Sequence, residues 1–457
     1  MSRRMRDAVA PTYLFFCLLL GGSAQGIFAN MMLQLFGLGL IAWATLAAPR
    51  QEVSRGQVQL FWLIVLALGV VAIQLIPLPP AVWTQLGGRN VIADGYRILG
   101  IATPWLPLSV APYDTLSSLL SLIPALAVLA AILRIGCKPW MLATALVTGT
   151  FMGILLGALQ VSSANPATSS WYLYAETNPG LATGFFANAN HMADLLVITL
   201  PFLAAMLARA RERGSDGQSY SAAIVFVAGA ILVIAVGIAL NGSLAGYGLS
   251  LPVLVASASI AFPRARKFSN LLAPGAVVLI IVAIGWLATT PLSSASGLQA
   301  TAETSVQSRQ EILKTSLHAA GEYLPFGSGV GSFAQVYALY EDHDRLDPTT
   351  YVNHAHNDYV EIALEAGVLG IILIVLFLVW WARSAWQKWR QRSRDPYASA
   401  AVIASAAILL HSVVDFPLRT AAISACFALC LALIARSRPT PKPDKSQLWA
   451  TRHVVIE

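Results

Sequence analysis

Residues 361–382 read EIALEAGVLGIILIVLFLVWWA and carry charge only at Glu361 and Glu365. A run of roughly 18 or more apolar residues can cross the hydrocarbon core of a bilayer, about 30 Å thick, as a helix. Similar runs recur near 12–29, 31–48, 58–77, 115–133, 139–161, 191–208, 221–240, 246–262, 271–290, 397–415 and 419–435. The sequence therefore predicts an all-α, polytopic membrane protein with about 12 spans, in a range of about 10 to 12.

The whole chain has the composition of a membrane protein. Of its 457 residues, 57% are hydrophobic and 11% are charged, whereas soluble domains carry about 25% charged residues. We expect one membrane domain over residues 1–457. The basic residues Arg3, Arg4 and Arg6 precede the first run, as in a signal peptide, but no small-residue cleavage site follows, so we expect the segment to be retained.

The basic residues predict the orientation of the chain in the membrane. With the N-terminus inside, the inner segments hold 23 of the 29 Lys and Arg residues but only 7 of the 22 acidic residues. This pattern follows the positive-inside rule and predicts that both termini are cytoplasmic. The net charge of +7 then indicates contact with anionic membrane lipids and not with nucleic acid. The inner segments are 1–10, 49–57, 134–138, 209–220, 263–270, 383–396 and 436–457.

The largest predicted outer segment is a periplasmic loop over residues 291–360, between the ninth and tenth spans. Apolar residues at helical spacing predict a helix over 304–320, capped by Thr304 or Ser305 and followed by Pro325. A glycine-rich turn at 327–331 leads into a second helical stretch over 332–340. Two further outer segments cover residues 78–114, which are rich in Pro and aromatic residues, and residues 162–190.

The end of the large loop carries the most suggestive polar motif, HAHND at residues 354–358. An imidazole, with an ordinary pKa of about 6.5, can act as a base near neutral pH. In that reading Asn357 or Asp358 orients the ring of His354 or His356. In the alternative reading Asn357 or Asp358 caps the next helix and both histidines are solvated. A metal site would need a further ligand from elsewhere in the chain, and we expect none.

Basic and acidic residues elsewhere in the outer parts offer further candidates. Arg309 is one of six basic residues outside the inner segments, and its planar guanidinium suits a phosphate group. Alternatively, Arg309 pairs with Glu311 or with the acidic tract that follows residue 340. His411 and Asp415 can line a cavity at a helix end, although Asp415 and Arg419 at i, i+4 can also simply pair.

Polar residues also begin the run at 191–208, where Asn188 and Asn190 precede His191. Polar donors at a helix N-terminus suit an anion or a sugar. The alternative reading is that these side chains only cap the helix.

Four motifs in this order resemble the O-antigen ligase superfamily, which also contains polysaccharide polymerases. They cover residues 184–417, and the third is the most specific. They are GFFANANH at 184–191; Ser308-Arg309 with PFGSGVG at 325–331; HAHNDY at 354–359 with EAGVLG at 365–370; and HSVVDFP at 411–417.

The resemblance implies a bacterial inner-membrane glycosyltransferase that is independent of metals and other cofactors and has its active site on the periplasmic face. Its donor would be a glycan on undecaprenyl diphosphate, and its acceptor a glycan or a lipid. His356 would be the base for the acceptor hydroxyl, with His354 as support, and Arg309 would bind the diphosphate. The other candidates would bind substrate: Asn188, Asn190, Asn357, Asp358, His411, Asp415 and Arg419.

The sequence departs from the family at one position. Ligase-like members carry a turn with a second arginine that contacts the diphosphate, and here the turn reads NGSLAGY at 241–247, with Leu244 in place of that arginine. A charge-assisted hydrogen bond of this kind is worth about 1.5–3 kcal/mol. Either Arg419, Lys314 or Arg97 substitutes for it, or the donor is held differently, or catalysis is lost.

Several functions remain open from the sequence. A ligase and a polymerase differ only in the acceptor, and transfer to a protein is a third variant of the same chemistry. The alternative from a different class is a polysaccharide transporter or flippase without transferase activity. A flippase would place cationic residues inside its spans, whereas the outer basic residues here fall in loops or at helix ends, which favours an enzyme.

Overall fold

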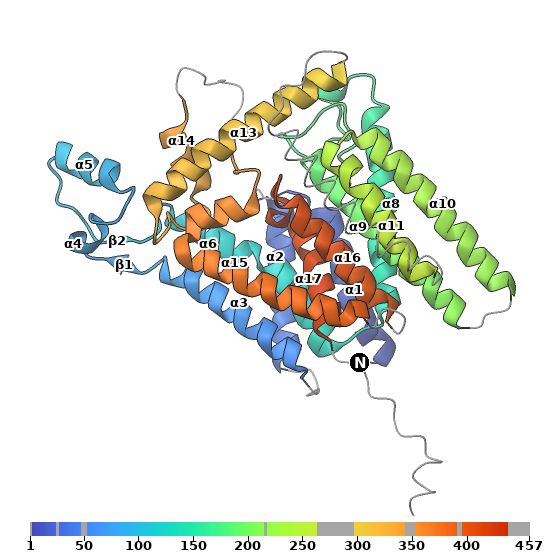
Figure 1. Cartoon of the computed structure of the whole chain (residues 1–457). Helices are drawn as coiled ribbons and strands as arrows, with labels where there is room; N and C mark the ends of the chain where they lie inside the picture. Colours follow the sequence, from blue (N-terminus) through green and yellow to red (C-terminus); the bar gives the residue numbers. More distant parts are fainter. Residues whose placement is uncertain are drawn as a thin grey trace, which may run out of the picture.

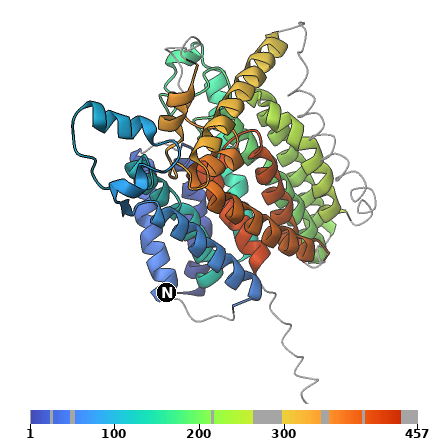
Figure 2. The ribbon, with the colours of Figure 1, turned by 60° about the vertical axis from the view of Figure 1, so that its left-hand side comes forward.

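A computed structural model describes residues 2–23, 27–46, 53–213, 217–262, 297–342, 352–390 and 395–436. The described chain is a bundle of helices, and its only β structure is a pair of two-residue strands (Figure 1). The predicted all-α, polytopic membrane fold is therefore confirmed. A turned view shows the helices of the two halves of the chain packed side by side in one bundle (Figure 2).

The first half of the chain forms helices and a small extension at one end of the bundle. The helices are α1 (Arg3–Leu20), α2 (Phe28–Leu46), α3 (Arg55–Ile73), α4 (Pro80–Trp83), α5 (Asn90–Ile98), α6 (Pro112–Ser121), α7 (Ile123–Ala130) and α8 (Pro139–Val161). A π-helical turn, η1 (Ala131–Ile135), extends α7, and a 3-10 turn, η2 (Pro166–Thr168), follows α8. The strands β1 (Pro77–Leu78) and β2 (Leu106–Pro107) pair antiparallel and bracket α4 and α5.

The second half provides most of the elements that surround the polar residues. The helices are α9 (Ala189–Glu212), α10 (Gly217–Asn241), α11 (Leu244–Ala261), α13 (Gly297–Tyr323), α14 (Phe333–Tyr340), α15 (Asp358–Arg390), α16 (Pro396–His411) and α17 (Ala421–Ala435). A short 3-10 turn, η5 (Pro417–Arg419), joins α16 to α17.

Most of the predicted spans are confirmed as long apolar helices. Within the described residues, eight helices are long and apolar enough to cross a membrane, and α16 and α17 are shorter apolar helices. The predicted run at 271–290 lies outside the described residues. The run predicted at 12–29 was misplaced, because α1 begins at Arg3 and ends at Leu20. The run predicted to reach residue 415 ends at His411, since residues 412–420 form the connection to α17.

The predicted loop helices are also found, with different bounds. The helix predicted over 304–320 is α13, which begins earlier, at Gly297, so neither Thr304 nor Ser305 is its cap. The second predicted stretch is α14, with Ser332 at its N-cap position. Helices α13 and α14 lie at the same end of the bundle as the start of α15 (Figure 1).

Helix α9 is the centre of the bundle. Nearly all of its residues are buried, because α8, α10, α11 and α16 pack around it. Small residues allow the closest approach: a Cβ on Gly246 of α11 would lie 2.8 Å from the Cβ of Ala193. Dispersion contacts and close backbone packing of this kind hold helices together where lipid removes the hydrophobic driving force between them.

The glycine-rich turn packs directly on the start of α15. Gly327 has a φ of +81°, and a Cβ there would lie 2.5 Å from the carbonyl oxygen of Glu365. Gly367 has a φ of +58° and breaks the regular helix at the point where the turn crosses it. Only glycine fits both backbones at this distance, so the turn fixes the first two helical turns of α15.

Candidate active site

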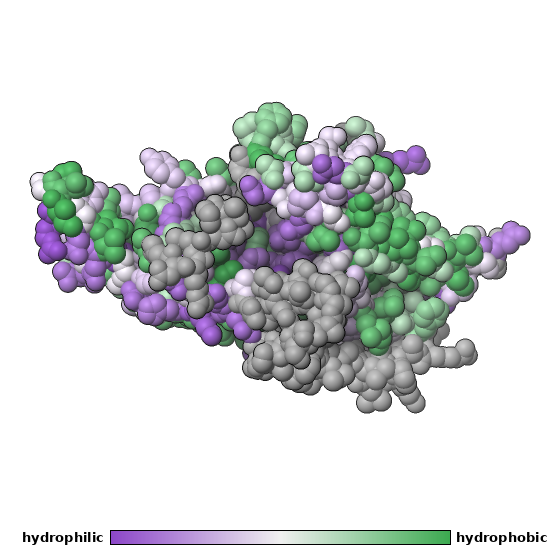
Figure 3. Space-filling view, turned by 90° about the horizontal axis from the view of Figure 1, so that it is seen from above, coloured by the Kyte–Doolittle hydropathy of each residue, from purple (hydrophilic) through white to green (hydrophobic). Residues whose placement is uncertain are grey.

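The predicted site residues gather at one end of the bundle. They come from the starts of α9 and α15, from α13, and from the connection between α16 and α17. Seen from above, this end carries hydrophilic residues at its centre and apolar residues over the side formed by α10 and α11 (Figure 3). Two groups of charged residues can be distinguished there, one around Asp415 and one around Arg419.

His356 lies in an unusual backbone conformation in front of α15. Its φ is +48°, and among the described residues it is the only non-glycine residue with a positive φ. A left-handed conformation costs a residue with a Cβ about 1–2 kcal/mol, and such strain concentrates at functional sites. The conformation brings Nδ1 of His356 to 3.2 Å from Oδ1 of Asp415, while the side chain stays 24% exposed. This contact engages Nδ1 and leaves Nε2 outside the pair.

Asp415 is a fully buried carboxylate that gathers the first group of charges, the Asp415 cluster. Its Oδ1 accepts hydrogen bonds from the His356 ring and from the backbone N–H of Phe416, at 2.9 Å. Its Oδ2 accepts a hydrogen bond from Nδ2 of Asn190. Burial raises the pKa of Asp415, but the hydrogen bond from His356 and the nearby cationic groups outweigh burial and hold this pKa well below its usual range.

Arg309 approaches the same carboxylate from α13. Its Nη2 lies 3.8 Å from Oδ2 of Asp415, and its side chain is 27% exposed. The pair is longer than a hydrogen bond, so the donors of the guanidinium are not used up by Asp415. Among the described residues, the ion pair of Arg309 is the one with Asp415, while Asp344 and Asp347 of the acidic tract lie outside these residues.

The N-termini of α9 and α11 meet beside Asp415. Asn190 joins them, since its Oδ1 accepts a hydrogen bond from Oγ of Ser243, the N-cap of α11, at 2.7 Å. Asn188 caps α9 by accepting a hydrogen bond from the backbone N–H of Asn190. Leu244 is the first residue of α11, and its side chain is half exposed. Asn190 is therefore a contact residue of the cluster, whereas Asn188 has the capping role of the alternative reading.

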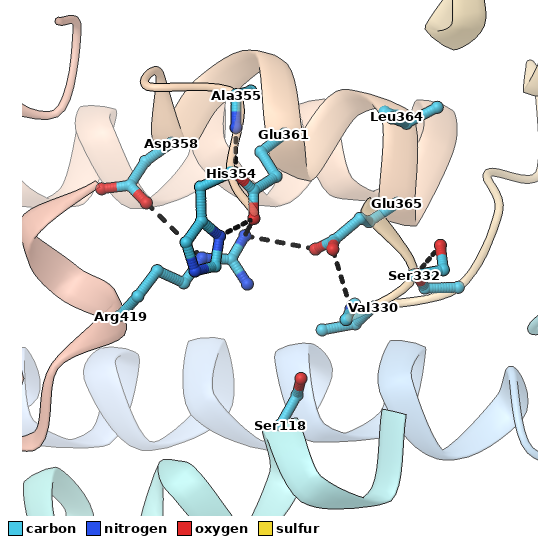
Figure 4. Close-up of polar contacts among 12 residues, drawn as sticks. Ser118, Val330, Ser332, His354, Ala355, Asp358, Glu361, Leu364, Glu365 and Arg419 are labelled. Atoms are coloured by element: carbon cyan, nitrogen blue, oxygen red, sulfur yellow. Dashed lines mark hydrogen bonds and ion pairs between the residues drawn. The ribbon is translucent and has the colours of Figure 1, made fainter. Parts of the chain in front are cut away.

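Arg419 lies in a second group of charges, the carboxylate cage, which we define as Arg419 with Asp358, Glu361 and Glu365 (Figure 4). Its Nη2 lies 3.0 Å from Oε1 of Glu361 and 3.2 Å from Oε2 of Glu365, and its Nε lies 3.6 Å from Oδ1 of Asp358. Burial lowers the pKa of Arg419, but the three carboxylates outweigh it and raise this pKa above its usual value. Arg419 is thus neutralised by the cage. The alternative in which Arg419 pairs with Asp415 is not found among the described ion pairs.

The cage connects to His354 and to the glycine-rich turn (Figure 4). Oε1 of Glu361 lies 2.8 Å from Nδ1 of His354, and Oε2 accepts a hydrogen bond from the N–H of Ala355 at 2.8 Å. Oε1 of Glu365 accepts a hydrogen bond from the N–H of Gly331 at 2.8 Å. The cage therefore holds His354 on one side and the turn on the other.

Neither residue predicted to orient a histidine ring does so. Asn357 caps α15, since its Oδ1 accepts hydrogen bonds from the N–H groups of Tyr359 and Val360, both at 3.0 Å. Asp358 accepts a hydrogen bond from Oγ of Ser412 at 2.8 Å and faces Arg419. The rings are oriented instead by Asp415 and Glu361.

A further buried ion pair, between His411 and Asp194, lies next to the Asp415 cluster. Nδ1 of His411 lies 3.0 Å from Oδ1 of Asp194, and its Nε2 lies 3.9 Å from Oδ2 of Asp415. Phe416 separates the histidines, with ring centroids 5.1 Å from His191, 4.2 Å from His354 and 5.0 Å from His356. His411 therefore joins the Asp415 cluster through Asp415.

The sequence analysis missed four residues of this site: Asp194, Glu361, Glu365 and Phe416. For Asp194 a signal was present, because an acidic residue inside an apolar run is a functional candidate by default. Glu361 and Glu365 stood at i, i+4 at the start of a span, which is the same signal. Phe416 stood in the HSVVDFP motif, but an aromatic residue at a helix end has no distinctive pattern of its own.

The fold and the site define a class: an all-α, multi-pass membrane protein whose ionisable residues converge at one end of the bundle. Residues 180–375 match the family model described as O-Antigen ligase. This segment is therefore similar to the O-antigen ligase family, and the resemblance predicted from the sequence is confirmed over these residues. The match supports membrane glycan transfer by a glycosyltransferase-like enzyme that acts on lipid-linked glycans and acceptors. No curated protein matches the chain.

The match has a structural consequence. It contains Arg309, His354 and His356 but ends at residue 375, before His411, Asp415 and Arg419. The structure brings these later residues into contact with the matched ones, through the pairs His356–Asp415 and Arg419–Glu361. Residues beyond the matched segment therefore complete the arrangement.

Proposed function

We propose that this chain is a membrane glycosyltransferase that moves a glycan from undecaprenyl diphosphate to an acceptor hydroxyl on the periplasmic face of the bacterial inner membrane. The observation that carries the proposal is the convergence of His356 and Arg309 on the buried Asp415. One side chain is suited to remove a proton and the other to hold a phosphate, and both are partly exposed. The site as a whole would act as a base next to an anion-binding group.

His356 is the proposed base. Asp415 holds Nδ1, which leaves Nε2 to accept the proton of the acceptor hydroxyl. The hydroxyl oxygen forms a bond to the anomeric carbon while the bond from that carbon to the diphosphate oxygen breaks. The proton ends on His356, next to an ionised carboxylate, and undecaprenyl diphosphate leaves. Direct displacement of this kind inverts the configuration at the anomeric carbon.

Arg309 is the proposed group for the leaving diphosphate, on which negative charge develops as the bond breaks. A guanidinium in a partly dry site stabilises such charge, and its fork can bind two oxygens at once. Because the ion pair with Asp415 is long, at 3.8 Å, Arg309 can turn to the donor without breaking a short hydrogen bond. The N-termini of α9 and α11, which Asn190 joins, would supply further donors toward an anion.

Two of the three substitutes considered for the family arginine at Leu244, Arg419 and Arg97, are already paired with carboxylates. Arg419 is neutralised in the carboxylate cage. Arg97 lies on α5 and pairs with Asp94, at 2.8 Å, on the exposed extension. Lys314 is exposed on α13, one turn beyond Arg309. The proposed phosphate grip therefore rests on Arg309 and the helix N-termini.

The acceptor decides between a ligase, for which it is a lipid-linked core or another glycan, and a polymerase, for which it is a second lipid-linked repeat. The proposed chemistry is the same for both. Supply of purified acceptors of the two kinds to the isolated protein would separate them.

The proposal is tested with His356→Ala and Arg309→Ala, expressed in cells that lack the wild-type protein. General base catalysis is worth about 10²- to 10⁴-fold, so we expect His356→Ala to lower glycan transfer by that factor. Loss of a charge-assisted contact of about 1.5–3 kcal/mol predicts a fall of about 10- to 150-fold for Arg309→Ala. The measurements are polymer or conjugate output and the amount of lipid-linked donor that accumulates.

The matched control is His318→Ala, on the same helix as Arg309. His318 is 69% exposed and contacts Glu322 in the next turn, so its loss leaves the site unchanged. We expect wild-type transfer from this variant. Wild-type transfer from both site variants, at equal amounts of folded protein, would show that the assignment of base and phosphate grip is wrong.

A further inference from the structure

We propose that the buried pair Asp194–His411 belongs to the catalytic machinery as two positioning residues that act through Asp415 on His356. This inference rests on the proposed function, because it assigns a role relative to the proposed base. Both residues lie in helices of the bundle, at positions that no substrate reaches: the side chain of His411 is 1% exposed and that of Asp194 is 0% exposed. Their effect must therefore pass through a neighbour.

The geometry forms a line of alternating carboxylates and imidazoles. Asp194 lies 3.0 Å from Nδ1 of His411, Nε2 of His411 lies 3.9 Å from Asp415, and Asp415 lies 3.2 Å from Nδ1 of His356. The line runs from the interior of α9 to the exposed base. Both ring nitrogens of His411 lie near carboxylates, those of Asp194 and Asp415. In His356 one ring nitrogen lies near Asp415, and the other is the one proposed to face the substrate.

The complete burial of Asp194 indicates that its ion pair with His411 is not an incidental surface contact. It lies five residues after the start of α9 at Ala189, about 7.5 Å along the helix axis, and is itself fully buried. Within the described chain, His411 is the group that its carboxylate faces in an ion pair. A buried carboxylate is expensive without a cation, so Asp194 stabilises the imidazolium form of His411. Nε2 of His411 lies 3.9 Å from Oδ2 of Asp415, so the imidazolium acts on Asp415 as a nearby charge and not through a hydrogen bond.

The two oxygens of Asp415 have different neighbours, and this difference indicates why a second cation, His411, is needed beside Arg309. Oδ1 holds His356 and the N–H of Phe416, whereas both cations, Arg309 at 3.8 Å and His411 at 3.9 Å, lie nearest to Oδ2. When Arg309 turns to the donor diphosphate, one of the two cations leaves. His411, fixed by Asp194, then remains and keeps Asp415 ionised and in place, so that Oδ1 continues to orient His356.

The competing role for the pair is a structural link between α9 and α16. The chain offers a matched link of that kind on the same helix: Oγ1 of Thr199 lies 2.8 Å from Oγ1 of Thr150 on α8, and both are fully buried. Replacement of Thr199 by Val removes a buried polar contact of α9 away from the line of residues. It therefore reports the cost of losing a link between helices without any effect through Asp415.

The test compares Asp194→Asn, the double variant Asp194→Leu with His411→Leu, and Thr199→Val with the wild-type protein. The double variant replaces the pair by apolar side chains, which generally preserves stability and keeps the variant foldable. Each purified protein is assayed for transfer from the lipid-linked oligosaccharide extracted from cells that lack the protein. The measurements are kcat, the KM for donor, and the dependence of kcat/KM on pH.

We expect kcat to fall about 10- to 100-fold for both site variants, as when outer partners of metal-bound imidazoles are lost, with donor KM changed less than about threefold. In Asp194→Asn the cation beside Asp415 is lost, so the carboxylate favours a protonated His356. The acid limb of the pH profile then moves to higher pH. The groups that face this line are His191 on α9, Arg309 on α13, and His354 and His356 before α15.

Thr199→Val should keep the wild-type profile. Wild-type kcat and an unmoved acid limb in the double variant would overturn the inference and leave the pair a structural link. The result for His356→Ala separates the two proposals. If that variant transfers glycan normally, the proposed base is wrong. If it is inactive while both Asp194 variants behave as wild type, only the role of the pair is wrong.

Discussion

Replacement of Arg419 by Met should destabilise the protein more than the loss of any exposed ion pair. The carboxylates around Arg419 are almost fully buried, with side-chain exposures of 5% for Asp358, 0% for Glu361 and 1% for Glu365. Met fills a similar volume but carries no charge. The variant therefore keeps the packing and leaves three acidic groups in the interior without their cation.

The magnitude follows from the geometry of the cage. A contact of about 4 Å between unit charges near a protein surface is worth about 4 kcal/mol before desolvation is counted, and most of this gain is offset by desolvation. What the variant adds is uncompensated buried charge, which typically costs about 3–5 kcal/mol. Since whole proteins are stable by about 5–15 kcal/mol, this loss is a large part of the total.

The measurement is the free energy of unfolding in detergent, followed by far-UV circular dichroism during denaturant titration. The control is Arg209→Met, which breaks an exposed pair with Glu212, with exposures of 49% and 32%, and should cost no more than about 1 kcal/mol. A second change, Glu365→Gln in the Arg419→Met protein, removes one of the carboxylates and should restore about 1–2 kcal/mol. Its amide oxygen still accepts from Gly331.

A destabilisation of Arg419→Met that is no larger than that of Arg209→Met would refute this reasoning. So would the absence of any recovery in the double variant, because the cost would then not come from uncompensated carboxylates. Either result would mean that Arg419 is not neutralised by the cage, and its exclusion from the phosphate grip would need revision.

Three further predictions follow from single positions. His356→Gly should be about 1 kcal/mol more stable than His356→Ala, because glycine adopts the φ of +48° without strain, and both should be inactive; equal unfolding energies would contradict the strain. Leu244→Arg restores the family cation at the start of α11 and should lower the KM for donor about tenfold or more, as steady-state kinetics would show; an unchanged KM would mean that the donor phosphates lie elsewhere. Gly327→Ala should cost at least about 1–3 kcal/mol, because its Cβ would lie 2.5 Å from the carbonyl oxygen of Glu365 at a φ of +81°, whereas Gly321→Ala meets no atom within 4 Å and should be neutral or stabilising in the same unfolding measurement.

The sequence predicted most of the helices because a membrane span is a local property. Each long apolar run is recorded in consecutive residues, so its position can be found without knowledge of its neighbours. The errors lie at helix ends. Helix α1 starts among the arginines at Arg3, and α16 stops at His411 although apolar residues continue to Val414. The start of α1 depends on the residues that precede the apolar run, and the end of α16 depends on the connection to α17. Hydropathy records neither boundary.

The site was predicted less completely, because its partners are distant in the chain. His356 and Arg309 were identified from residue type and resemblance, but their common partner Asp415 lies 59 residues beyond His356. The sequence left open whether Asn357 or Asp358 orients a ring or caps the helix, and the structure gives Asn357 the cap and Asp358 a place in the cage. Which carboxylate meets which imidazole depends on how the connection from α16 to α17 folds over α15, and spacing does not record this.

The arrangement of charge also favours an enzyme over the alternative of a flippase. A carrier must expose its charged residues to a moving substrate along a path through the membrane. Here Arg419, Asp415 and Asp194 each form ion pairs with residues of other segments, and the partly exposed side chain of His356 is the outer end of that set. Fixed partners of this kind suit a preorganised reaction site.

The two functions make opposite predictions for a protein reconstituted in sealed vesicles. With donor placed only in the leaflet that faces His356 and acceptor supplied on the same side, an enzyme consumes donor and releases undecaprenyl diphosphate without moving any donor across the bilayer. A flippase exchanges donor between the leaflets and leaves the glycosidic bond intact. The proposed base is needed only for glycan transfer, so His356→Ala should abolish consumption of donor. If this variant instead moved donor between the leaflets at the wild-type rate, that result would favour the flippase.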